Sequence, residues 1–204
     1  MALKPTHATL QLKGEEKDDK QDQQPPRIDQ HLFDSRHILV TGEVTQDMAR
    51  DVCARLFAMS HVSSDPITMV VSSPGGHVES GDMIHDTIKF IAPTVKMLGT
   101  GWVASAGALI FVAAKPENRF ALPNTRFLLH QPSGGAGGSA SDIKIQAMEI
   151  IKMRARLNKI FADATGQPIE KIEADTERDH WLTAEEAIDY GLVGKIIHSA
   201  AELT

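Results

Sequence analysis

Cysteine is almost missing from this chain, because Cys53 is the only one among 204 residues. A single cysteine excludes a disulfide within the chain and also a structural zinc site built from several thiolates. Long apolar runs are missing as well: none reaches the about 18 to 20 residues of a membrane-spanning helix, and the first residues show no continuous apolar leader segment. We therefore expect a cytoplasmic protein with no membrane contact.

An excess of positive charge is also absent. The formal net charge is −6, and the 21 lysines and arginines are scattered rather than gathered in a stripe that could follow phosphates. Neither a Gly-x-Gly-x-x-Gly loop nor a Gly-Lys-Ser/Thr loop is present. His77 and His85 stand too far apart on one expected helix to share an ion. These observations argue against a nucleic-acid partner, and we expect neither a cofactor nor a metal site.

Short apolar runs and helical patterns alternate from Ile28 onward, and 42% hydrophobic residues are enough for a sizeable core. The runs predict strands and the helical periods predict helices. Strands are expected at residues 37–41, 67–71, 95–98, 127–130 and 193–197, and helices at residues 46–60, 77–91, 105–114 and 142–164. A capping box at Thr183–Glu186 predicts one more helix, which Gly191 closes. This alternation predicts the α/β class.

The polar segment of residues 14–26 contains charged side chains but no apolar anchor. Such a segment gains too little from burial to offset the conformational entropy lost on ordering. We therefore predict a flexible N-terminal segment, residues 1–27, followed by a folded domain, residues 28–204.

Ser105 is a candidate nucleophile. Small residues flank it directly, Ala104 before it and Ala106, Gly107 and Ala108 after it, so that other backbone segments can approach its hydroxyl, and an apolar helix is expected to begin there. Attack of a serine on a carbonyl creates an oxyanion, which free N–H groups at a helix start stabilise. The alternative is a plain helix N-cap. The Gly-x-Ser-x-Gly elbow is incomplete, because Val103 replaces its first glycine.

His130 and Asp179 are candidates for the groups that would activate such a serine. His130 ends an apolar strand, which would fix an imidazole beside a cleft as a general base requires. The alternative is a strand-end histidine bonded to a nearby carbonyl. Asp179 lies on a loop before the capping box and would orient the imidazole, but nothing local favours it over Asp175 or Glu177.

Residues 73–76, Ser-Pro-Gly-Gly, form a sharp turn between an expected strand and an expected helix. Two glycines there allow backbone N–H groups to point outward. This turn would supply half of an oxyanion hole, with the N–H of Ala106 as the other half. An ordinary tight turn is the alternative.

Four ordered blocks resemble the proteolytic subunit of the ATP-dependent Clp protease (caseinolytic protease). They are residues 73–76, 104–108 (Ala-Ser-Ala-Gly-Ala), 122–135 and 176–193, and the similarity extends in register from about Asp34 to Ile197. The resemblance implies a crotonase-like α/β fold with a protruding handle at about residues 131–165. It also implies a serine endopeptidase of unfolded polypeptides, enclosed in two stacked seven-membered rings. An AAA+ unfoldase ring would feed polypeptide substrates into these rings.

The resemblance assigns roles to single residues. It implies that Ser105 is the nucleophile, His130 the base and Asp179 the orienting acid. The oxyanion would be bound by the N–H groups of Gly75 and Ala106. The remaining implied residues contact the peptide or the opposite ring: Gly76, Gln131, Pro132, Gly134 and Gly135 for the peptide, and Glu177 and Arg178 for the ring.

The chain departs from the family pattern in several places. Ala106 replaces a larger residue, commonly Met. Thr68 and Val70 stand where tyrosines line the unfoldase-docking pocket, so we expect an altered docking surface. More small residues than usual follow His130, which predicts a softer handle strand. Residues 14–26 replace the usual axial-loop sequence, and a propeptide, a pore plug and a plain tail are all open for them.

Two rival functions use the same fold. A non-catalytic or regulatory ring subunit would explain the altered docking strand but not the complete set of Ser105, His130 and Asp179. A crotonase-type acyl-CoA enzyme would hold a thioester oxyanion with the same N–H groups, yet no paired glutamates stand near the expected cleft. The sequence therefore favours the serine endopeptidase.

Overall fold

The computed structural model describes residues 28–135 and 137–203, and the predicted flexible segment, residues 1–27, lies outside this part of the chain. The helices are α1 (Ile28–Asp34), α2 (Gln46–Val62), α3 (Val78–Phe90), α4 (Ala106–Phe111), α5 (Ala140–Thr165), α6 (Ile169–Asp175) and α7 (Ala184–Tyr190), with 3-10 turns η1 (Pro116–Asn118) and η2 (Ala200–Leu203). The strands are β1 (His37–Thr41), β2 (Ile67–Ser73), β3 (Val95–Ala104), β4 (Arg119–Ala121), β5 (Arg126–Leu129), β6 (His180–Leu182) and β7 (Lys195–Ile196). Strands and helices alternate along the chain, so the predicted α/β class is confirmed.

One sheet contains all of these strands. β1, β2, β3, β4 and β7 lie side by side in that order and are parallel. β3 is long enough to have two neighbours on one side: it pairs with β4 through Met97↔Arg119 and, further along, with β5 through Ala104↔Leu128. β6 pairs with β5 in the antiparallel sense. The carboxyl end of β3 therefore lies beside β5, and β6 is next in line.

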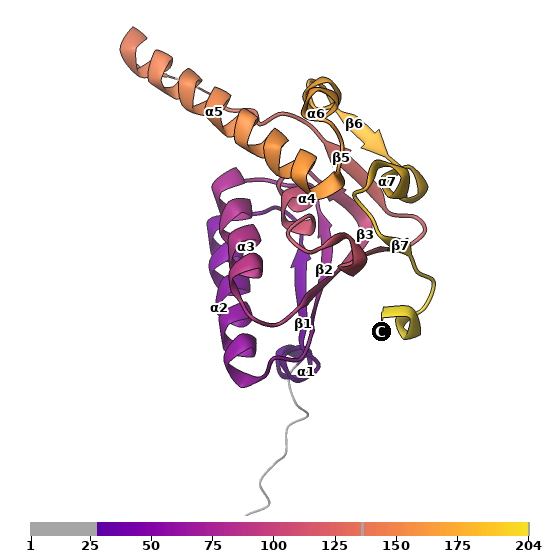
Figure 1. Cartoon of the computed structure of the whole chain (residues 1–204). Helices are drawn as coiled ribbons and strands as arrows, with labels where there is room; N and C mark the ends of the chain where they lie inside the picture. Colours follow the sequence, from indigo (N-terminus) through magenta and orange to yellow (C-terminus); the bar gives the residue numbers. More distant parts are fainter. Residues whose placement is uncertain (1–27, 136, 204) are drawn as a thin grey trace, which may run out of the picture.

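Helices α2, α3 and α4 cover one face of the sheet (Figure 1). Alternate residues of β2 are fully buried in this core, namely Ile67, Met69 and Val71, whereas Thr68 and Val70 are half-buried on the other face. Burying each large apolar side chain contributes about 1.5 to 3 kcal/mol. Since a shift by one residue would move the apolar set to the other face, this alternation fixes the strand register.

Helix α5 projects from the body of the molecule (Figure 1). A capping box between Ser139 and Asp142 begins it, and Gly166 ends it in the left-handed conformation at φ 75°. The hydrogen bonds from the Ser139 side chain and backbone hold the pKa of Asp142 below its usual value. The buried residues of α5, Leu157, Asn158 and Phe161, all lie in its C-terminal part. This part therefore anchors the helix, and the N-terminal part forms the projection.

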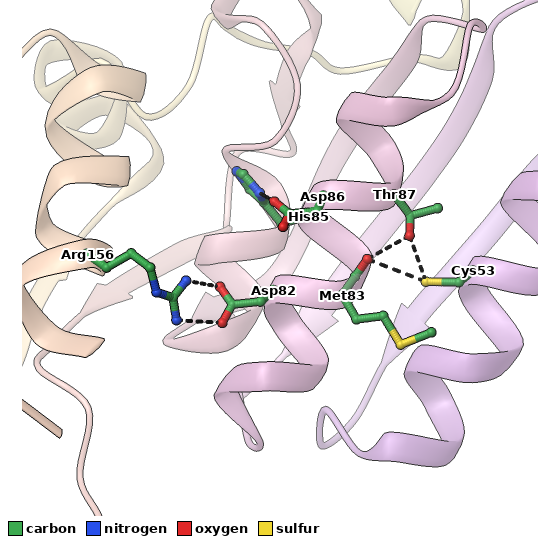
Figure 2. A network of polar contacts seen from close by, with 7 residues as sticks. All are labelled: Cys53, Asp82, Met83, His85, Asp86, Thr87 and Arg156. Carbon is green, nitrogen blue, oxygen red and sulfur yellow. Dashed lines mark hydrogen bonds and ion pairs between the residues drawn. The ribbon is translucent and has the colours of Figure 1, made fainter. Parts of the chain in front are cut away.

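An ion pair attaches α5 to α3 beside this anchor (Figure 2). The two terminal nitrogens of Arg156 donate to the two carboxylate oxygens of Asp82 at 2.5 and 2.6 Å. The hydrogen bonds to Asp82 raise the pKa of Arg156 still further, so that the guanidinium stays charged. Such a bidentate contact fixes the orientation of the two side chains as well as their distance.

Cys53 lies in the core between α2 and α3 (Figure 2) and is 1% exposed. Its sulfur accepts a hydrogen bond of 3.3 Å from the Thr87 hydroxyl. Burial raises the pKa of the thiol, so the reactive thiolate is disfavoured. Cys53 is therefore a packing residue rather than a nucleophile.

Candidate active site

Ser105 occupies a strained turn between β3 and α4. Its backbone has φ 53° and ψ −120°, and Arg36 is the only other non-glycine residue with positive φ in the described ranges. An ordinary N-cap has an extended backbone and a side chain that accepts a hydrogen bond, but the Ser105 side chain forms no capping bond. The plain N-cap interpretation therefore does not fit. Strain of this kind costs about 1 to 3 kcal/mol and is common at functional sites.

The turn has the strand–turn–helix form of a nucleophile elbow although the sequence motif is incomplete. Glycines allow it because other backbone lies very close. A Cβ at Gly75 would lie 2.6 Å from the Cβ of Ser105, and a Cβ at Gly107 would lie 3.0 Å from the Cβ of Ser73. The turn of residues 73–76 therefore packs directly against the candidate nucleophile.

Strand pairing brings the three predicted triad residues to one edge of the sheet. Ser105 follows the paired residue Ala104, and its N–H donates to the carbonyl of Leu128 at 2.9 Å. His130 follows Leu129, which pairs with His180, and Asp179 directly precedes His180. The structure thus joins segments that lie far apart in the sequence.

His130 and Asp179 are in contact but not hydrogen-bonded. The Nδ1 atom of His130 lies 3.8 Å from Oδ1 of Asp179, beyond the range of an N–H···O bond. The His130 side chain is 28% exposed and that of Asp179 is 67% exposed. The contact must therefore tighten before Asp179 can hold the imidazole in one orientation.

The sequence left Asp175, Glu177 and Asp179 as alternatives, and the contacts differ among them. Asp175 accepts hydrogen bonds from Lys171 at 2.6 Å and from the Tyr190 hydroxyl at 2.8 Å. Burial alone would raise the pKa of Asp175, but these hydrogen bonds lower it overall. Glu177 pairs with an arginine of α5. Within the described chain, Asp179 is the carboxylate of the three that approaches the imidazole of His130.

The predicted oxyanion donor Gly75 has another partner. Its N–H donates to Oγ of Ser73 at 3.1 Å, and this hydroxyl in turn donates to the carbonyl of Gly42 at 2.6 Å. The N–H groups of Gly76 and Ala106 donate no hydrogen bond to any of the residues that the structure describes. Gly76 is therefore a better candidate than Gly75 for the oxyanion donor, and nothing in the sequence distinguishes the two glycines.

The residues predicted to contact a peptide follow His130 without forming a strand. The backbone N–H of Gln131 donates to the carbonyl of Thr176 at 2.7 Å, and its side-chain amide donates to the carbonyl of Glu177 at 2.8 Å. Gly134 packs near Ile150 of α5, since a Cβ there would lie 3.3 Å from that side chain, and the space around Gly135 is open. Pro132 belongs to the same irregular segment. Peptide binding by this segment stays a prediction.

The inter-ring roles of Glu177 and Arg178 also stay predictions. The Glu177 carboxylate forms an ion pair of 2.7 Å with Arg154 of its own chain. Arg178 is exposed and forms no ion pair with another described residue.

The candidate site is open to solvent, since the Asp179 side chain is largely exposed and the His130 side chain is partly exposed. A pocket of about 610 Å³ lies elsewhere, between the end of α3, the η1 turn and the C-terminal part of α5, and no predicted site residue lines it. Among the residues with described positions, no three His, Cys, Asp or Glu side chains gather where an ion would bind. The same part of the chain contains no helix that is long and apolar enough to cross a membrane.

Comparisons with known proteins show the family and the fold of this chain. The sequence model of the Clp protease family matches residues 20–200. The ATP-dependent Clp protease proteolytic subunit 3 of Rhizobium etli is 60% identical over 194 residues, which cover 94% of this chain and 100% of that protein. Subunit 2 of Pseudomonas aeruginosa is 60% identical over 178 residues, which cover 87% and 89% of the two chains. The solved structure of ClpP1 from Listeria monocytogenes superposes with a TM-score of 0.79 at 51% identity and covers 87% of this chain and 100% of that one.

Proposed function

Because the chain belongs to the Clp protease family, we propose that this serine-type peptidase hydrolyses unfolded polypeptides inside a self-enclosed ring chamber. The chain has the predicted crotonase-like α/β fold with a protruding handle helix. The observation that best supports the catalytic assignment is the strained Ser105 turn, which lies beside the strand that leads to His130, the residue in contact with Asp179.

The chemistry is an acyl transfer. Oγ of Ser105 attacks the peptide carbonyl while Nε2 of His130 accepts the hydroxyl proton, and Asp179 stabilises the resulting imidazolium through the Nδ1 side. The N–H groups of Gly76 and Ala106 bind the oxyanion of the tetrahedral intermediate. His130 then gives its proton to the leaving amine, the C–N bond breaks, and water releases the acyl group by the same steps.

The loose contact between His130 and Asp179 is compatible with this mechanism. Catalytic hydrogen bonds are often long in unliganded enzymes and tighten when substrate binds. The 3.8 Å separation must shorten by about 1 Å to reach hydrogen-bond distance. Exclusion of water from the exposed Asp179 by an assembled chamber would strengthen the attraction.

Enclosure of the candidate site in a ring chamber would explain why the site itself can be open to solvent. Main-chain hydrogen bonds to an added peptide strand accept almost any sequence, and no predicted site residue lines the pocket of about 610 Å³. Stacked seven-membered rings would therefore limit access, and an AAA+ unfoldase ring would supply the substrates. The half-buried Thr68 and Val70 of β2 offer no aromatic ring to such a partner, so we expect weaker docking than in family members with tyrosines there.

Replacement of the nucleophile tests the proposal. Ser105→Ala should reduce turnover of a small fluorogenic peptide by at least about 10³-fold, because triad members act as a unit. The assembly should be unchanged, which native mass spectrometry checks. Full peptidase activity in this variant would refute the mechanism. Intact rings of the unmodified protein that cleave nothing would favour the non-catalytic ring subunit instead.

A further inference from the structure

A network of hydrogen bonds connects α5 to the two segments that end in His130 and Asp179. The guanidinium of Arg154 donates through one terminal nitrogen to Oε1 of Gln131 at 3.2 Å and through the other to Oε2 of Glu177 at 2.7 Å. The amide of Gln131 completes the ring by donating to the backbone carbonyl of Glu177 at 2.8 Å. Three distant parts of the chain therefore meet at one side chain.

The network lies where the sheet no longer supports the triad. His130 and Asp179 stand just outside the paired residues of β5 and β6, so ladder hydrogen bonds do not hold them. Gln131 is the next residue after His130, and Glu177 lies two residues before Asp179. The separation of these two segments decides whether the 3.8 Å contact between His130 and Asp179 can tighten.

We propose that Arg154 is a positioning residue that couples the handle helix α5 to the geometry of the His130–Asp179 pair. A planar guanidinium can hold two acceptors in a fixed relative orientation, which a lysine ammonium does less well. Arg154 lies on the helix that projects from the body (Figure 1), so a displacement of α5 would act on both triad segments and could change their separation. This role depends on the proposed peptidase mechanism.

The same contacts contribute little to folding stability. The Arg154 and Glu177 side chains are 33% and 54% exposed, and ion pairs at such positions contribute about 0 to 1 kcal/mol. A change at Arg154 should therefore affect turnover much more than it affects stability. This separation distinguishes positioning from a purely structural role.

Arg154→Met tests the proposal because it keeps the aliphatic stem and removes every donor. We expect kcat for a small peptide to fall by about 10- to 100-fold, as for a misplacement of catalytic groups by about 1 Å. KM should change less than kcat, because Arg154 itself does not touch the substrate, although its partner Gln131 is among the residues predicted to contact the peptide. Arg154→Lys should retain an intermediate kcat.

Arg156→Met is the matched control. It lies on the same helix and also breaks an ion pair, with Asp82, but it touches neither triad segment. Its kcat should stay within about twofold of the unmodified protein. In a double-mutant cycle, Glu177→Gln should add little to the loss of kcat caused by Arg154→Met, since both changes break the same hydrogen-bond network.

The outcomes separate this proposal from the proposed function. If the unmodified assembly cleaves no peptide, the peptidase mechanism itself is refuted. If the unmodified assembly is active, an unchanged kcat in Arg154→Met refutes the positioning role. An equal loss in Arg156→Met, or a loss that only accompanies dissociation of the assembly in native mass spectrometry, refutes it as well.

Discussion

At the scale of single residues, the proposed mechanism depends on the close approach of the 73–76 turn to Ser105. Gly75 has φ +94°, a conformation that favours glycine, and a Cβ there would lie 2.6 Å from that of Ser105. The turn must shift if any side chain is added. The strained serine and the nearby N–H groups would then lose their common geometry.

We therefore predict that Gly75→Ala reduces kcat/KM by at least about 100-fold, since misplacement by about 1 Å has effects of this size. Gly137→Ala is the control, because a Cβ there meets nothing within 4 Å and Gly137 is not one of the predicted site residues. Steady-state peptide hydrolysis by both variants checks the prediction. Similar kcat/KM values in the two variants would show that the close approach is not needed.

A second prediction at the scale of single residues concerns the hydroxyl of Tyr190. Burial and then the neighbouring Asp175 raise the pKa of its hydroxyl, which therefore stays protonated and donates to that carboxylate. Tyr190→Phe removes this bond, and at pH 7 we expect a loss of about 1.5 kcal/mol in the free energy of unfolding, typical of a hydrogen bond to a charged group.

The pH dependence of folding stability provides a second test of this hydrogen bond. The folded-state pKa of Asp175 is lowered, so its stabilising contribution is present above the usual carboxyl pKa of about 4 and is lost as the pH falls through the lowered value. The difference in the free energy of unfolding between Tyr190→Phe and the unmodified protein should therefore become smaller as the pH is lowered from 7 to 3. Urea unfolding at both pH values measures it, and an equal difference would contradict the assignment.

At the scale of secondary-structure elements, the Asp82–Arg156 ion pair should hold the base of α5. Asp82→Asn keeps the shape of the side chain and removes its charge. We expect a loss of about 1 kcal/mol, or roughly 2 to 4 °C in Tm for a chain of this size, with little change in kcat. Thermal unfolding followed by circular dichroism checks this, and an unchanged Tm would show that the pair does not anchor the helix.

Elements with a strong apolar period could be predicted from the sequence. The strand at His37–Thr41 and helix α7 (Ala184–Tyr190) follow the predicted positions, the latter through its capping box and Gly191. β3 continues to Ala104, well beyond the predicted end, because the small residues before Ser105 carry no clear pattern. The short strands β4 and β6 were missed, since only pairing with neighbouring strands defines three-residue elements.

The candidate site could be predicted only in part. The resemblance selected Ser105, His130 and Asp179, but the positive φ of the serine is invisible in the sequence. The choice between Gly75 and Gly76 depends on the hydrogen bond to Ser73, and the link from Arg154 depends on a contact between segments 23 residues apart. Such features arise from tertiary packing rather than from local preference.

At the scale of the whole molecule, exposed apolar surface supports assembly. The projecting part of α5 exposes Ile143, Ile145, Met148 and Ile151. On the sheet, Trp102 and Trp181 are partly exposed and stack at 6.5 Å, with the guanidinium of Arg126 4.3 Å from the Trp181 ring centre. Grouped exposed apolar residues commonly mark interaction surfaces. Copies of this chain in a ring would cover them and close the open site.

Mass spectrometry of intact particles with and without a fluorophosphonate probe tests the central claim most directly, because assembly and nucleophile are read together. The proposed mechanism predicts ring-sized particles in which every subunit gains one adduct, located on Ser105 by peptide mapping and lost in His130→Ala. Particles of the expected mass without an adduct, or with an adduct on another residue, would contradict it.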